Sequence, residues 1–202
     1  MSSHHFVKEQ QEPALLLLLE EIEDTETLSS LLEWVPTVLV TQNNVQKIMS
    51  LGIKIDGILA TKEFQNANPY LLEEQHPVIF ITSAEGAFLE AGLNYLREKE
   101  HHAVNILNFD PLRIRELLPQ LSNLDIVFFY NGIRYFPARK GKMKKWFPEG
   151  PIQVHGAEGQ FIEHQSASSS NVFRIQYTTF LELEEGFHTF SSNDLFWIGT
   201  LV

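Results

Sequence analysis

The chain has 202 residues, of which 44% are hydrophobic, so it is long enough to bury one large core or two modest ones. Its 26 acidic and 15 basic side chains give a formal net charge of -11, which argues against a surface that binds nucleic acid or an anionic membrane. The absence of cysteine excludes disulfides, a thiolate nucleophile and cysteine-ligated zinc. The longest purely apolar run, residues 14–19, is much shorter than the roughly 20 residues of a membrane span, and no small-residue cleavage site follows it. We therefore expect a cytoplasmic protein without a membrane partner.

Short apolar runs alternate with helical patterns over the first 130 residues. The apolar runs are uninterrupted, as is typical of strands buried on both faces, and they lie at residues 14–19, 37–41, 55–60, 78–82, 104–107 and 126–130. Apolar residues at helical spacing predict helices at residues 28–32, 45–52 and 85–99. Strands that alternate with helices predict a mainly parallel α/β domain, which we place at residues 1–137.

The remainder of the chain has a different pattern. From residue 150 onward it offers strand-like pieces and no helical pattern, at residues 152–155, 160–164, 172–177, 179–183, 187–190 and 195–202. We expect an all-β domain at residues 150–202. Residues 138–149 hold five of the fifteen basic side chains, and we interpret them as a solvated linker. Phosphate binding is the alternative, although no glycine-rich loop or helix start frames this segment.

Other polar clusters give weaker signals. Residues 20–24 are mostly acidic and follow the first strand, so they either hold a divalent ion or form a solvated helix start that the helix dipole favours. The paired histidines at 4–5 and 101–102 do not share a face, so we expect no structural metal. No serine has the context of a hydrolase nucleophile.

Five segments form a frame that spans nearly the whole chain, at residues 11–16, 31–40, 51–59, 101–106 and 145–150. In their order and spacing these segments resemble the thiamine pyrophosphokinase family, and most closely its bacterial branch with a tryptophan-proline signature. Members of this family transfer a diphosphate group from ATP to thiamine. The resemblance implies an N-terminal α/β nucleotide-binding domain followed by a C-terminal β-sandwich. It also implies a homodimer, formed through the β domain, whose subunits share active sites.

The loops that carry the family's catalytic residues differ in this chain. Leu19-Glu20 replaces an Asn-Gly turn after the first strand, and Gln42-Asn43 replaces an Asp-Gly pair after the second. The aspartate-rich metal loop reads Ala-Thr-Lys-Glu at residues 60–63, and the acidic segment after the fourth strand becomes residues 83–88. The resemblance therefore marks as degenerate catalytic positions Gln42, Thr61, Glu63, Ser83, Glu85 and Phe88.

Two further sets of residues match the family in part. Arg113 and Arg115 keep the positive charge of a family segment that would bind phosphate. Asp110 keeps the negative charge of an acidic residue in the same segment. Ser191, Ser192 and Asn193 resemble the loop that holds the thiamine pyrimidine. Residues 169–171, which also read Ser-Ser-Asn, are the alternative counterpart.

These departures predict impaired catalysis, because phosphoryl transfer depends on Mg²⁺ and carboxylates fix that metal. Lys62 also places a positive charge where the cation would bind. We therefore expect a ligand-binding, regulatory or partner-binding homodimer that recognises a thiamine-like small molecule. A crevice without catalysis would be lined by Leu19, Ala84, Ala87 and Phe88.

Two alternatives remain open. The chain could be an active thiamine diphosphokinase that uses ATP and Mg²⁺, with relocated metal ligands among Glu20, Glu63 and Glu85. Convergence of these carboxylates, with Glu21, would indicate such a site. It could instead be a structural subunit that pairs with an active paralogue through the β domain.

Overall fold

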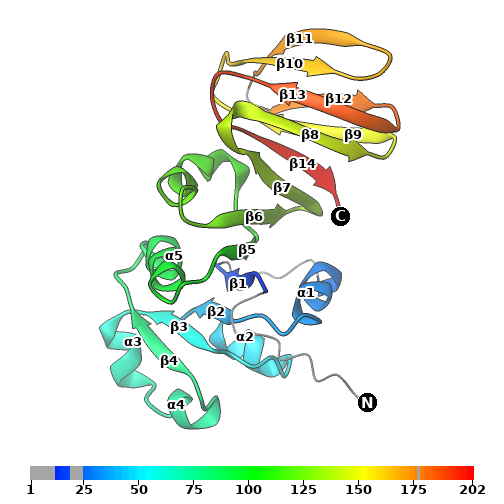
Figure 1. Cartoon of the computed structure of the whole chain (residues 1–202). Helices are drawn as coiled ribbons and strands as arrows, with labels where there is room; N and C mark the ends of the chain where they lie inside the picture. The colour runs from blue at the N-terminus through cyan, green and yellow to red at the C-terminus, as the bar shows by residue number, and fades with distance from the viewer. Residues whose placement is uncertain (1–11, 19–24, 177) are drawn as a thin grey trace, which may run out of the picture. The chain divides into compact units, whose positions relative to one another are not determined.

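The computed structural model describes residues 12–18, 25–176 and 178–202, and the chain divides into two compact units, Met1–Ile126 and Val127–Val202 (Figure 1). Among the described residues, none of the helices is both long and apolar enough to cross a membrane. The first unit is an α/β domain and the second consists of antiparallel strands, which confirms the predicted fold class.

The first unit is built on a parallel sheet. Its described strands pair in the order β5-β1-β2-β3-β4, and every pair is parallel. The strands are β1 (Ala14–Leu17), β2 (Val38–Thr41), β3 (Gly57–Ala60), β4 (Ile79–Thr82) and β5 (Ala103–Leu107). Every residue of β1, β2 and β3 is buried, as their uninterrupted apolar runs predict.

Helices connect these strands. They are α1 (Thr25–Leu32), α2 (Val45–Ser50), α3 (Lys62–Ala67), α4 (Leu71–Glu74), α5 (Phe88–Glu98) and the 3₁₀ segment η1 (Pro111–Gln120). The sequence predicts α1, α2 and α5, whereas α3, α4 and η1 are additional. The helix α5 buries Leu89, Leu93 and Leu96. At Gly92 it comes so close to the sheet that a Cβ atom would lie 3.1 Å from Leu16 and 3.2 Å from Leu59.

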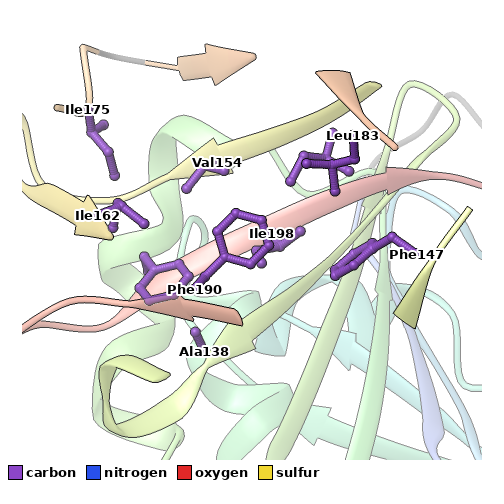
Figure 2. Close-up of a cluster of buried hydrophobic side chains, with 10 residues drawn as sticks. Ala138, Phe147, Val154, Ile162, Ile175, Leu183, Phe190 and Ile198 are labelled. Carbon is purple, nitrogen blue, oxygen red and sulfur yellow. The ribbon is translucent and has the colours of Figure 1, made fainter. Parts of the chain in front are cut away.

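The second unit is a sandwich of two antiparallel sheets. One contains β6 (Asp125–Tyr130), β7 (Ile133–Ala138), β14 (Phe196–Leu201), β9 (Gly150–His155) and β12 (Thr178–Leu183), in that order. The other contains β11 (Ser170–Arg174), β10 (Phe161–Gln165), β13 (Gly186–Ser191) and β8 (Lys142–Phe147), in that order. Figure 2 shows the core, to which Val154 and Ile198 contribute from the first sheet and Phe147, Ile162 and Phe190 from the second. This arrangement matches the sandwich that the resemblance implies.

The boundary differs from the predicted one. The structure assigns β7, which ends at Ala138, to the second unit, and the predicted linker at residues 138–149 contains the short 3₁₀ turn η2 (Arg139–Gly141) and strand β8. The basic side chains of β8 are not simply solvated, because Lys145 Nζ lies 4.1 Å from the centre of the Phe136 ring. Because the segment is rich in basic residues, the sequence analysis interpreted it as a linker and missed strand β8, whose Phe147 is buried in the core.

A chain of polar side chains crosses the second sheet of the sandwich. Asn171 Oδ1 lies 3.2 Å from His164 Nδ1, and His164 Nε2 lies 2.8 Å from His188 Nδ1. His188 Nε2 lies 2.8 Å from the Glu184 carbonyl oxygen. Both imidazoles are buried and nearly coplanar, with an angle of 9° between them, and every ring nitrogen has a partner inside the protein.

Candidate functional site

The carboxyl ends of the parallel strands are the expected ligand site of the first unit. In open α/β sheets, ligands bind in the crevice beyond these ends. Gln42, Thr61 and Ser83 directly follow β2, β3 and β4, which are neighbours in the sheet. The structure therefore brings these three predicted positions to one edge, which we call the carboxyl edge.

Gln42 joins the loops after β2 and β3. Its side-chain Oε1 accepts a hydrogen bond of 2.9 Å from the Thr61 N–H, and its own N–H donates to the Leu59 carbonyl at 2.8 Å. Thr61 is the N-cap of α3, and its hydroxyl oxygen accepts from the Phe64 N–H at 3.3 Å. Both side chains thus have structural hydrogen bonds, and both are neutral.

Gln65 joins the loops after β3 and β4. Its Nε2 donates to the Ala60 carbonyl at 3.0 Å and to Thr82 Oγ1 at 3.1 Å. The Ser83 N–H also donates to the Ala60 carbonyl, at 3.0 Å. The sequence analysis did not single out Gln65. Recognition of Thr61 as a helix cap would have placed Gln65 one turn into α3, facing back to this edge.

Asn44 lies at the β1 side of the same edge. It is completely buried, and its Nδ2 donates to the Leu17 carbonyl at 3.2 Å. Its Oδ1 is buried and has no partner among the described residues. Leu19 and the acidic run at residues 20–24, with the candidate metal ligands Glu20 and Glu21, lie outside the described residues.

The described carboxylates of this edge do not form a metal site. Glu63 in the first turn of α3 and Glu85 before α5 are both exposed, as is Lys62. Within residues 12–18, 25–176 and 178–202, no three histidine, aspartate or glutamate side chains are grouped so that they could hold a metal ion.

The expected apolar lining is present only in part. Phe88, the first residue of α5, and Ala87 before it are half-buried, whereas Ala84 is exposed. Ser83 Oγ donates to the carbonyl of Ala84 at 3.0 Å, so this hydroxyl is used within its own loop.

The predicted phosphate ligands lie on η1. Arg113 donates twice to Glu116, from Nε to Oε1 at 2.8 Å and from Nη2 to Oε2 at 2.7 Å. The hydrogen bonds from Arg113 lower the pKa of the Glu116 carboxyl. Arg115 is exposed, and Asp110 caps η1 by accepting from the Leu112 N–H at 2.9 Å. Arg113 is thus held by a neighbouring glutamate on its own segment.

The predicted pyrimidine-binding residues follow β13 in the second unit. Ser192 Oγ accepts from Gln160 Nε2 at 2.8 Å and donates to the Phe161 carbonyl at 2.8 Å. Ser191 Oγ donates to Glu163 Oε2 at 3.2 Å, and Asn193 is exposed. The two serines anchor this loop, and the sequence analysis missed Gln160, which anchors it from the other side.

The alternative counterpart, residues 169–171, lies at the start of β11. Ser169 takes part in a serine turn, in which its N–H donates to Ser166 Oγ at 3.0 Å. Asn171 faces His164 in the buried histidine pair. Of the two asparagines, only Asn193 lies outside a strand and is free of that pairing.

Comparisons with known proteins connect this fold to solved structures. No family model matches the chain, and no curated protein matches its sequence. Thiamine pyrophosphokinase from Candida albicans matches with a TM-score of 0.67 and 10% identity, over 96% of this chain and 90% of that one. The Bacillus subtilis enzyme matches with a TM-score of 0.65 and 11% identity, over 95% and 100%. The Geobacillus thermodenitrificans enzyme gives 0.64 and 11%, over 94% and 97%. The chain therefore has the fold of the thiamine pyrophosphokinases over nearly its whole length.

Proposed function

We propose that this chain is a thiamine pyrophosphokinase-like protein with impaired diphosphate transfer, which serves as a ligand-binding, regulatory or partner-binding homodimer. The observation that supports the proposal is the neutral hydrogen-bond network of Gln42, Thr61 and Gln65 at the carboxyl edge. Diphosphate transfer from ATP needs Mg²⁺ to neutralise the phosphate charge, and hard cations prefer carboxylate ligands. Gln42, Thr61 and Gln65 offer amides and a hydroxyl in hydrogen bonds instead.

Lys62 strengthens the argument by its charge. It lies between the network residue Thr61 and the exposed Glu63, and its ammonium group repels a divalent cation at that loop. The same charge attracts a phosphate group. Binding of a phosphorylated or thiamine-like ligand is therefore compatible with this edge, whereas Mg²⁺-dependent transfer is disfavoured.

The proposed contact with a thiamine-like ring is Asn193. Hydrogen bonds with Gln160 and Phe161 fix Ser192 next to Asn193. Asn193 is exposed, and its carboxamide offers both a donor and an acceptor to a ligand. Asn193→Ala is the direct test of this contact, because the substitution leaves the hydrogen bonds of Ser192 in place.

The proposed homodimer surface is the outer face of the sheet β11-β10-β13-β8. Trp146 and Phe187 are direct cross-strand neighbours on that face, and they are 46% and 63% exposed. Phe161 and Val172 are exposed on the neighbouring strands. Exposed apolar side chains in register on one face are typical of a protein interface.

Analytical ultracentrifugation tests this surface. We expect the wild-type chain to sediment as a dimer and Phe187→Lys to shift it to a monomer. Phe180→Lys is the matched control, because Phe180 is 66% exposed but belongs to the other sheet. A monomeric wild-type chain would contradict the homodimer.

A thermal-shift matrix combined with a product assay tests the main proposal. The chain is heated with thiamine, ATP and Mg²⁺, singly and in all combinations, and thiamine diphosphate is measured in the same samples. The Bacillus subtilis enzyme serves as the active control. We expect stabilisation by at least one organic ligand, with no dependence on Mg²⁺ and no product. A ligand at 100 times its Kd stabilises by about 2.7 kcal/mol.

An active enzyme with relocated metal ligands is the second candidate. It is favoured by two exposed carboxylates, Glu63 in the first turn of α3 and Glu85 before α5, which follow the adjacent strands β3 and β4. If the chain is such an enzyme, thiamine diphosphate forms in the presence of Mg²⁺, and Glu63→Gln and Glu85→Gln each reduce its formation. Product formation by the wild-type chain would falsify the impaired-enzyme proposal.

A further inference from the structure

A cavity of the first unit lies at the opposite edge of its parallel sheet. The cavity has a volume of about 750 Å³, within the range of small-molecule sites. Its walls include Thr37, Asp56, Pro77 and His101, which precede β2, β3, β4 and β5 respectively. We call it the amino-edge cavity. None of the residues predicted from the sequence to bind ATP, metal or thiamine lines it.

His101 contributes a nearly buried imidazole to the wall of the cavity. The side chain is only 5% exposed, and its Nδ1 atom is buried with no partner among the described residues. A buried polar atom left unpaired costs about 1 to 3 kcal/mol, so such atoms are rare in folded proteins. Because this Nδ1 atom is closed to solvent, the ligand contacts of the cavity come from its more exposed lining residues.

Lys99 gives the cavity a positive charge. Its Nζ lies 5.9 Å from the centre of the Tyr95 ring, and both residues line the cavity. The negative charge of Asp56, which also lines it, is already offset, because Asp56 Oδ1 accepts from Lys54 Nζ and Oδ2 accepts from the Val38 N–H, each at 2.9 Å. The charged lining residues therefore leave one net positive charge, which favours an anion.

Tyr95 can add a hydrogen bond. Burial, followed by the nearby Asp56 carboxylate, raises the pKa of the Tyr95 hydroxyl, so the phenol stays protonated and able to donate. The lining thus offers a hydrogen-bond donor and a cation, and its carboxylate is already paired. This combination suits an anionic group of a ligand.

Val35, one of the apolar lining residues, has an unusual backbone conformation. Val35 is 87% exposed and has a φ of 50°, a conformation that is uncommon for any residue and unfavourable for a β-branched one. With Pro36, Ile53 and Pro77 it forms an apolar wall of the cavity. An exposed valine beside a cavity offers contact area to the apolar body of a ligand.

We propose that the amino-edge cavity binds a small molecule that carries one anionic group, a carboxylate or a phosphate, on an apolar or aromatic body. Lys99 and Tyr95 bind the anion, and Val35 and its neighbours cover the apolar body. The site is separate from the carboxyl edge, so it does not depend on whether the protein transfers diphosphate.

Nuclear magnetic resonance titration of the full chain tests the site with defined probes. The probes are benzoate, phenyl phosphate and uncharged benzyl alcohol, each at millimolar concentration. We expect at least one anion to produce saturable shifts of the His101 ring and the Val35 amide, and the comparison of the two anions identifies the preferred group. Benzyl alcohol should bind at least about fivefold more weakly, which corresponds to about 1 kcal/mol for one charge contact.

Two variants on α5 and its end complete the test. Lys99→Ala should weaken the binding of the anion about fivefold. Arg97→Ala removes a nearby cation that does not line the cavity, and it should leave the binding unchanged. The proposal is overturned if neither anion shifts these resonances, if benzyl alcohol binds equally well, if both variants behave alike, or if the shifts map to the loops at Gln42 and Thr61.

Discussion

The two edges of the parallel sheet are built from different chemistry. At the carboxyl edge, Gln42 and Gln65 join successive loops through neutral amide hydrogen bonds. At the amino edge, the charged Asp56 makes the joining contact, and a cavity with the unpaired His101 Nδ1 lies beside it. The amide side chains of Gln42 and Gln65 are thus used in structural hydrogen bonds at the carboxyl edge, where Asn44 Oδ1 has no described partner, whereas a charged contact joins the amino edge. The same sheet therefore connects its loops by different chemistry at its two ends.

Removal of the Asp56 carboxylate should give the largest effect. Asp56→Ala leaves the Val38 N–H without its acceptor at the buried start of β2, and we expect a loss of about 2 to 3 kcal/mol in the free energy of unfolding, measured in urea. Asp56→Asn keeps an acceptor oxygen and should lose less. Lys54→Ala removes only the exposed ion pair and should cost less than about 1 kcal/mol. Equal losses in all three variants would remove the contrast between a structural carboxylate and a surface charge.

Gln42 is the corresponding test at the carboxyl edge, with a smaller effect. Gln42→Ala leaves the half-buried Thr61 N–H without its acceptor, and we expect a loss of about 1 kcal/mol. Gln42→Glu keeps the acceptor and should be close to wild type at neutral pH. If Gln42→Ala is as stable as wild type, the network at this edge is incidental, and the argument for its structural role fails.

Lys99 separates ligand binding from stability. Lys99→Ala should change the free energy of unfolding by less than about 0.5 kcal/mol, because the lysine is exposed and its contact with the Tyr95 ring is long. The same variant should weaken anion binding at the amino-edge cavity. A large loss of stability would instead make Lys99 a structural residue and would leave the two edges more alike.

The smallest change should come with pH. Burial, and then the neighbouring histidine, lowers the pKa of His101 in the first unit and of His164 in the second. The unfolded chain, with histidine pKa values near 6.5, therefore binds protons first as the pH falls. We expect stability to be complete above about pH 6.5 and to decrease below it. Melting curves at several pH values, combined with the ring resonances of both histidines, check this, and ring titration above pH 6.5 would reverse the sign.

Much of the fold was readable from local patterns. Apolar runs that are long enough for a strand and buried on both faces identified the strands of the parallel sheet, because such runs are unusual elsewhere. The strand β7 was missed, although Asn131-Gly132 was a clear sign of a hairpin. These residues adopt φ values of 49° and 70° in the turn from β6 to β7, which is the conformation that this dipeptide favours.

The site was less predictable, because its contacts join residues that are far apart in the sequence. The sequence identified Gln42 and Thr61 as altered positions, but their mutual hydrogen bond depends on the packing of β2 beside β3. The amino-edge cavity could not be anticipated, since Asp56, Tyr95 and His101 have no shared spacing and meet only through the sheet order. Substitutions in loops can be recognised from the sequence alone, whereas the prediction of a cavity requires the three-dimensional arrangement of the elements.

The histidine pair of the sandwich has a consequence for proton counting. The Glu184 carbonyl can only accept, so His188 Nε2 carries a proton, and a neutral His188 must then receive a proton from His164 Nε2. A neutral His164 has a lone pair on Nδ1, which can bond only to the amide nitrogen of Asn171. An amide oxygen at that position would require one more proton on the pair, which burial disfavours. The orientation of the Asn171 carboxamide in β11 is therefore coupled to the number of protons on the two rings.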